Sequence, residues 1–213
     1  MSKKQTKVVK IAAFMLIFAC LASLFVGCGK PDEGEFIATV EELLVLSDKV
    51  NALCFGEGLV PDEEGYSSGA YREATKESLT LFGVNSTADI RALTRAVYSV
   101  VTAEWIESVV FSAVYEGGTV ISYSRYYDTV VSEKEGDRAA LMVKKDYDPL
   151  LSGRATYGNI RVVSLKSRRA EILVDVTVTK DGESRREKDV SLKLRNEEDG
   201  WRFDEATYFN YEQ

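Results

Sequence analysis

The side chains that could carry chemistry in this chain of 213 residues are carboxylates, lysines, tyrosines and three cysteines, because the sequence contains no histidine. Without histidine, Ser-His-Asp and Cys-His catalysis are excluded, and the histidine ligands usual for zinc and haem are missing. Two carboxylates could still hydrolyse a glycosidic bond. The 34 Asp and Glu residues are scattered, however, and no spacing singles out a pair. The sequence therefore identifies no catalytic residue, no metal ligand and no cofactor.

Cys54 lies well inside the chain, four residues after Val50, on the apolar face of a predicted helix. A cysteine in that setting is usually a small buried hydrophobe. A cysteine nucleophile would also need a base, and the chain has no histidine to supply one. We therefore expect Cys54 to be structural.

The densest run of acids, Asp62-Glu63-Glu64, offers oxygen atoms that could bind calcium. Its spacing differs from that of a calcium-binding loop, which places acids at alternate positions around a central glycine and ends in a distant Glu. We interpret this run as a solvated loop.

Aromatic residues give the one indication of a binding face. Tyr123, Tyr126 and Tyr127 fall in a predicted strand, where rigid amphipathic rings could line a groove for a glycan or a peptide. Tyrosine is also an ordinary strand residue. Because side chains alternate along a strand, Tyr123 and Tyr127 share one face and Tyr126 points to the other, so at least one of the three is expected in the core.

The N-terminal segment has three parts that together are typical of an export signal. A basic region is followed by an apolar run from Ile11 to Val26 and by the small residue Gly27. The basic region contains Lys3, Lys4, Lys7 and Lys10. The stretch Leu24-Phe25-Val26-Gly27-Cys28 resembles a bacterial lipobox. This resemblance implies cleavage before Cys28, a thioether-linked lipid on Cys28, and attachment to the extracytoplasmic side of the cell membrane.

Two other interpretations of this segment stay open. An uncleaved membrane anchor is disfavoured, because the apolar run from residue 11 to 26 is shorter than the roughly 20 residues that a spanning helix needs. A secretory peptide cut elsewhere, without a lipid, is the second. All three place the rest of the chain outside the cytoplasm.

The charge of the chain argues against nucleic acid as a partner. The first 27 residues hold four of the 27 basic residues and none of the 34 acids, which leaves the mature part with 23 basic residues and a net charge of −11. A polyanion needs a basic stripe to release its counterions. The basic pairs Arg168-Arg169 and Arg185-Arg186 lie among acids in strand or turn sequence, and we interpret both as solvated.

The first half of the mature chain has helical spacing. Residues 29–35 suit a short tether, and Thr39 with Glu42 predicts a capping box for a first helix that reaches Cys54. A second helical stretch is expected from Tyr71 to Phe82, closed by Gly83, and a third is expected to be capped by Ser86 and Asp89. A fourth contains Trp105 and Ile106, and Gly117-Gly118 ends the helical half.

The second half has the two-residue period of strands. Residues 170–179 alternate apolar and polar, Asp181-Gly182 predicts a hairpin turn, and residues 190–195 alternate again. Further strands are expected at residues 120–131, 139–145 and 157–165. Trp201 and Phe203 are predicted to face the core between the sheet and the helices, with Tyr208 on the same side.

Helices followed by a meandering antiparallel sheet define an α+β fold, with about four helical segments packed on the sheet. The last three strands, ending in Glu198-Asp199-Gly200-Trp201-Arg202-Phe203-Asp204, resemble the closing sheet of cystatin-like or nuclear-transport-factor-like folds. The expected organisation is a signal peptide at 1–27, a tether at 28–35 and one domain at 36–213, with a helical lobe at 36–116 and a sheet lobe at 119–213.

These observations favour a lipid-anchored, non-enzymatic domain that binds an envelope protein, a peptide or a glycan. Its partners would be the membrane, through the lipid on Cys28, and that ligand; no nucleic acid and no cofactor are expected. The alternatives are an envelope hydrolase that uses paired carboxylates and an inhibitor of cell-wall hydrolases.

Overall fold

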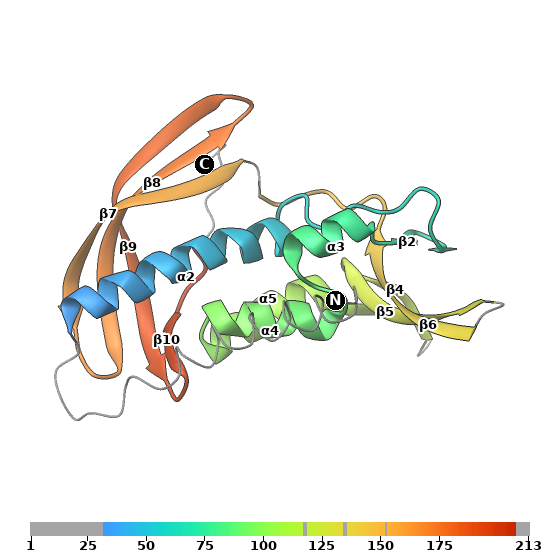
Figure 1. The fold of residues 1–213 in the computed structure, drawn as a ribbon, viewed down its shortest axis with the longest axis horizontal. Coiled ribbons are helices and arrows are strands. Elements are labelled where there is room, and N and C mark those ends of the chain that lie inside the picture. Colours follow the sequence, from blue (N-terminus) through green and yellow to red (C-terminus); the bar gives the residue numbers. More distant parts are fainter. Residues whose placement is uncertain (1–31, 117–118, 134–135, 152, 208–213) are drawn as a thin grey trace, which may run out of the picture.

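The structure, a computed structural model, describes residues 32–116, 119–133, 136–151 and 153–207. It has the predicted α+β fold: helices α2–α5 come from the N-terminal half, and the sheets consist of antiparallel strands (Figure 1). Strands β7–β10 form one four-stranded sheet in the order β10-β9-β8-β7, and β1, β2, β5 and β6 form another in the order β1-β2-β6-β5. Strands β3 and β4 pair with each other.

Helix α2 (Glu33–Cys54) is the longest helix and crosses the large sheet (Figure 1). Its N-cap is Asp32, whose Oδ1 accepts a hydrogen bond from the Glu35 N–H at 3.0 Å. The predicted cap at Thr39 is wrong, because Thr39 lies inside the helix and its hydroxyl donates to the Glu35 carbonyl. Asp32 begins the helix earlier because its side chain supplies the cap and the acids of the first turn suit the helix dipole.

The large sheet buries the predicted apolar face against α2. Its strands are β7 (Arg154–Leu165), β8 (Arg169–Lys180), β9 (Glu183–Glu197) and β10 (Gly200–Phe203). The buried residues of both strands match the prediction. They are Ala170, Ile172, Val174, Val176 and Val178 in β8, and Leu192 and Leu194 in β9. The predicted hairpin turn is also confirmed, since Asp181 and Gly182 both have positive φ, 50° and 84°.

The large sheet bends at two adjacent bulges around Asp175. The register shifts between Gly158 and Arg161 in β7, and again opposite Asp175 between β8 and β9. Asn159 and Asp189, with φ of 50° and 58°, lie in these bulges, and the Asp175 carboxylate accepts hydrogen bonds from the Asn159 amide and the Asp189 N–H. Bulges increase the local twist of a strand, so this pair curls the sheet around α2.

The helical lobe contains a strand that the sequence did not indicate. Residues Tyr71–Glu73, predicted as the start of a helix, form β2, which pairs with β1 (Ser67–Ser68) and β6 (Gly136–Lys144). Helix α3 (Lys76–Phe82) starts only after Thr75, whose hydroxyl caps it at the Ser78 N–H. Pairing with a strand about 70 residues later overrides the local helical spacing. The predicted end of α3 at Gly83 is confirmed by its φ of 63°.

Helices α4 (Thr87–Val97) and α5 (Val100–Phe111) pack beside α2. Ser86 caps α4 as predicted, with its hydroxyl accepting from the Asp89 N–H at 3.2 Å. The remaining strands are β3 (Ala113–Glu116), β4 (Thr119–Tyr123) and β5 (Tyr126–Glu133). The prediction that the helical half runs to Gly117-Gly118 is wrong, because α5 ends at Phe111 and Ala113–Glu116 form β3, which pairs with β4. The predicted core position of Tyr208 lies outside the described residues.

Trp201 and Phe203 lie in the core as predicted, with 3% and 0% of their surface exposed. The Trp201 ring contacts Phe36 edge to face, with centroids 5.0 Å apart, so β10 packs on the first turns of α2. Among the described helices, none combines the length and the apolar character needed to cross a bilayer.

Candidate functional site

The three tyrosines singled out by the sequence separate into two environments. Tyr126, at the start of β5, is fully buried in the main core. Its hydroxyl donates to the Leu53 carbonyl at 2.8 Å and accepts from the Leu59 N–H at 3.2 Å. Tyr126 therefore fastens β5 to the end of α2 and does not belong to an exposed binding face.

Tyr123, the last residue of β4, and Tyr127 of β5 lie together, away from the main core. Their common side was predicted from a single strand over residues 120–131, and that strand is wrong: it is interrupted after Tyr123, and β4 pairs with β3 whereas β5 pairs with β6. Their rings are nearly parallel, with centroids 4.6 Å apart and planes at 16°. Tyr71 of β2 stands edge-on to both rings, at 5.0 Å from Tyr127 and 6.5 Å from Tyr123. We call Tyr71, Tyr123 and Tyr127 the tyrosine cluster.

The tyrosine cluster belongs to a second, small hydrophobic cluster that is separate from the main core. Tyr71, Val131, Ala140 and Met142 are its buried members, and Tyr123 and Tyr127 are its half-buried edge. Two half-exposed stacked rings over an apolar floor can contact a ligand through their planes and hydrogen-bond it through their hydroxyls.

The Tyr71 hydroxyl fixes Tyr123 in place. It donates to the Tyr123 carbonyl at 2.5 Å and accepts from the Tyr123 N–H at 2.7 Å. A side chain thus replaces the hydrogen bonds that a neighbouring strand would give to the end of β4. The sequence offered no sign of this role, because Tyr71 was expected in a helix.

Tyr66 and Ser68 extend the tyrosine cluster toward β1. Tyr66 is 41% exposed. Burial raises the pKa of Tyr127 above its usual value, and a hydrogen bond with Ser68 and the neighbouring Tyr66 and Tyr71 modify that shift in smaller amounts. Tyr127 therefore stays a neutral hydrogen-bonding group near pH 7.

The sheet face that carries the tyrosine cluster also carries an ion pair. Glu73 and Arg138 make a two-pronged contact in which Nη2 of Arg138 lies 2.7 Å from Oε2 of Glu73. Glu73 is in register with Met142, which is in register with Tyr127, so the pair lies on the face of the tyrosine cluster. Because the two charges neutralise each other, this part of the face favours a ligand bound by rings and hydroxyls over one bound by charge.

A buried arginine holds the end of α2. Arg125 is 1% exposed, and its Nη2 donates to the Gly56 and Glu57 carbonyls at 2.7 and 2.6 Å. Its guanidinium lies 3.8 Å from the centre of the Tyr147 ring and 5.0 Å from that of Tyr126. Its Nε and Nη1 have no hydrogen-bond partner among the described residues. Arg125 thus fixes the loop that follows α2, near a helix end whose last turn has no basic residue of its own.

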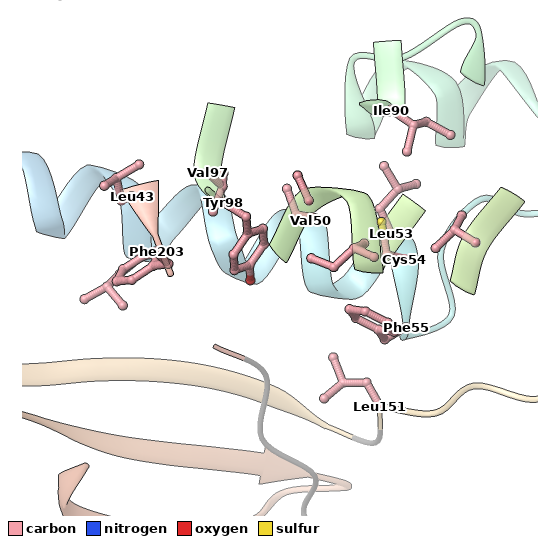
Figure 2. Close-up of a cluster of buried hydrophobic side chains, with 14 of the residues drawn as sticks. Leu43, Val50, Leu53, Cys54, Phe55, Ile90, Val97, Tyr98, Leu151 and Phe203 are labelled. Carbon is pink, nitrogen blue, oxygen red and sulfur yellow. The ribbon is translucent and has the colours of Figure 1, made fainter. Parts of the chain in front are cut away.

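Cys54 is buried at this same end of α2, beside Leu53 and Phe55 (Figure 2). Burial raises the pKa of its thiol to about 12, and the Arg125 charge and a hydrogen bond with Thr94 offset only part of that rise. A thiol with that pKa stays protonated and is a poor nucleophile at neutral pH. The expectation that Cys54 is a buried hydrophobe is confirmed.

Glu107 is the most deeply buried acid on the helices, at 6% exposed. Burial by itself would raise its pKa, but hydrogen bonds from Arg95 and Arg91 outweigh burial and hold the pKa below its usual value. The Arg95 Nε lies 2.7 Å from Oε1 of Glu107. Because both carboxylate oxygens bind arginines, Glu107 links α5 to α4. With its pKa lowered in this way, it has no proton to donate as a general acid at neutral pH.

The acids of the predicted loop bind nearby protein groups. Asp62 accepts a hydrogen bond from the Glu64 N–H at 3.0 Å, and Glu63 pairs with Arg72 at 3.0 Å. Over the described stretches of chain, no group of three or more His, Cys, Asp or Glu side chains is arranged to hold a metal ion. Cys28, the predicted lipidation site, lies outside the described residues.

No family model matches the chain, and no curated protein matches it significantly.

Proposed function

We propose that the chain is a cell-envelope lipoprotein whose extracytoplasmic domain binds a ligand without catalysis. The observation that carries this proposal is the tyrosine cluster, in which Tyr123 and Tyr127 stack as a half-exposed pair outside the main core. The lipobox-like segment ending in Cys28 supports the anchor. The ligand is an envelope protein, a peptide or a glycan.

The filling of the large sheet supports binding over hydrolysis. A hydrolase with paired carboxylates needs two carboxyl groups facing a cleft, about 5 to 9.5 Å apart. The side of the large sheet that faces α2 is occupied by aliphatic side chains of β8 and β9. The acids described above, Glu107 and Asp175, are each bound by arginine.

The binding test compares the full chain with two tyrosine variants. Tyr127→Leu keeps an apolar side chain in the small cluster but removes the ring and the hydroxyl, and Tyr123→Leu does the same for its partner. Trp105→Ala is the matched control, because Trp105 is also a half-exposed ring, at 45%, but lies on α5. We expect both leucine variants to lose a ligand from envelope extract that Trp105→Ala retains.

The extract is searched for proteins and glycans that the original chain enriches. A ligand retained equally by the original chain and both leucine variants would show that the tyrosine cluster is not the binding face. A thermal melt of each variant ensures that a loss of binding is not a loss of folding, since both rings also pack against the small hydrophobic cluster.

The anchor is tested by labelling cells with a fatty-acid analogue. Cys28→Ala should abolish the label and release the domain from membranes or leave it uncleaved. A diacylglyceryl group buries two acyl chains, and one chain alone gives only marginal binding, so the change from bound to released should be large. Equal labelling of Cys28→Ala and the original chain would overturn the lipobox interpretation.

A further inference from the structure

Helix α2 separates the two ends of the domain. Its 22 residues span about 33 Å at 1.5 Å per residue. Its N-cap, Asp32, follows Cys28 by four residues, which reach at most about 14 Å. A lipid on Cys28 would therefore keep the first turn of α2 near the bilayer. The tyrosine cluster lies toward the other end, where Tyr126 binds the Leu53 carbonyl (Figure 1).

The turn between β7 and β8 lies at the anchor end of α2. Phe36, in the first turn of α2, contacts Trp201, and Trp201 is in register with Asn196. Asn196 in turn donates from its amide to the Ser167 carbonyl at 3.1 Å and from its N–H to the Arg168 carbonyl at 3.0 Å. The turn is thus held rigidly to the strand that packs on the start of α2.

This turn is the exposed basic feature of that end. Lys166, Arg168 and Arg169 are all exposed, and no salt bridge to them is observed in the described part of the chain. The other basic pair behaves differently, since Arg185 is bound to Glu187 and Arg186 to Asp175. Three exposed cations therefore lie within four residues, of which Arg169 also interacts electrostatically with Asp204.

Several acids of the same end are already engaged. Asp32 caps α2, Glu197 accepts from the Val100 N–H at 3.2 Å, and Asp199 lies 3.6 Å from Arg202. Hydrogen bonds from backbone N–H groups leave Asp32 and Glu197 charged. With Asp199, Glu33, Glu35 and Glu198 they make six acids against the four cations Lys166, Arg168, Arg169 and Arg202, a net of −2 at this end, whereas the mature chain as a whole carries −11. This end is therefore weakly negative as a whole, and its positive charge is concentrated in the turn Lys166–Arg169.

We propose that the turn Lys166–Arg169 docks on the anionic headgroups of the bilayer that holds the lipid on Cys28. An anionic leaflet attracts the basic turn and repels the acidic remainder, so it orients the domain with α2 pointing away from the bilayer. The tyrosine cluster is then presented at the membrane-distal end, to a ligand that is not a lipid of the anchoring membrane. This inference rests on the proposed lipid anchor.

The orientation is measured by energy transfer from a donor dye on the domain to an acceptor lipid. The full lipidated chain is reconstituted in vesicles with 30 mol% phosphatidylglycerol or in pure phosphatidylcholine. One variant carries the dye at Ser167→Cys in the basic turn, and another at Ser132→Cys in β5, at the opposite end of the domain (Figure 1). Cys54 does not react with the dye because it is buried.

In anionic vesicles we expect strong transfer from position 167 and at least several-fold weaker transfer from position 132. The difference should shrink in phosphatidylcholine, which carries no net charge, and in 1 M salt, where the Debye length is only about 3 Å. The double variant Lys166→Glu/Arg168→Glu should abolish the difference in transfer. The matched control, Lys76→Glu with Lys145→Glu, makes the same change of charge at two exposed lysines outside the turn and should preserve it.

Equal energy transfer from positions 167 and 132 would overturn this inference while leaving the anchor intact. A difference that does not change with lipid charge, with salt or in the Lys166→Glu/Arg168→Glu variant would do the same. A chain whose mass shows no lipid on Cys28 would instead overturn the proposed anchor and the docking with it. The mass measurement on the reconstituted chain separates these two results.

Discussion

Trp201 offers the sharpest test of how the two lobes are joined. It is 3% exposed and packs its ring against Phe36 of α2. A buried tryptophan removes on the order of 200 Å² from water, which corresponds to about 5 kcal/mol at 25 cal/mol per Å². A compact denatured state lowers that figure by 10–40%, to roughly 3 to 4.5 kcal/mol. The cavity left by Trp201→Ala brings the expected loss of stability to about 3 to 5 kcal/mol.

The assay is thermal and urea unfolding of Trp201→Ala beside Trp105→Ala. Trp105 is 45% exposed and meets Phe55 at 5.8 Å, so its truncation should cost only about 1 kcal/mol. In a domain of this size each kcal/mol moves the melting midpoint by roughly 2–4 °C, which predicts a fall of about 6–20 °C for Trp201→Ala. Trp201→Phe, which keeps an aromatic ring, should lie between the original chain and Trp201→Ala.

Two results would refute this reasoning. An unchanged midpoint for Trp201→Ala would mean that the ring does not hold β10 to α2. Equal shifts for the two alanine variants would mean that burial does not distinguish the two tryptophans. A reduced slope with urea in Trp201→Ala would be a different result, because it reports a change in the denatured state or a loss of two-state unfolding.

Three further predictions follow from the helical lobe. Glu107→Gln should reduce the stability of the fold at neutral pH and make that stability less dependent on pH in the acid range. The folded-state pKa of Glu107 is lowered, so its contribution to stability is present above the unfolded-state pKa and is lost as pH falls through the folded-state pKa. Urea unfolding midpoints from pH 3 to 7 measure this. Gly58→Ala should lower the melting midpoint, because φ is +65° and a Cβ would collide with Arg125. Cys54 should resist alkylation at pH 8 in the folded chain and react once urea unfolds it, as mass spectrometry would record.

The features predictable from the sequence are those set by residues close to one another. Asp181 and Gly182 specify a hairpin turn because both can adopt positive φ, and Ser86 and Gly83 mark helix ends through local hydrogen bonds. The alternation in β8 is also local, and it places Val176 and its neighbours in the core.

The errors occurred where distant partners decide. Tyr71 has helical neighbours in sequence, yet it pairs with Lys144 in β6, and its hydroxyl binds the backbone of Tyr123. Strand parity correctly separated the adjacent Tyr126 and Tyr127, whereas Tyr123 lies on the separate strand β4. Parity also could not say which face was the core, because that depends on where α2 ends. Nothing near Arg125 in the sequence indicates that it would bind the carbonyls of Gly56 and Glu57, in the loop that follows α2.

The bulges around Asp175 are a further feature that local sequence does not predict. Alternation predicted an exposed Asp175, because its neighbours Val174 and Val176 point inward. The residue is instead buried, since the extra residues in β7 and β9 fold their polar groups onto its carboxylate. Hydrogen bonds from Asn159 and Arg186 lower the pKa of Asp175, so the carboxylate stays charged at neutral pH and keeps those donors in place. The curvature that lets one sheet enclose a 22-residue helix thus depends on an acid that the periodicity assigned to solvent.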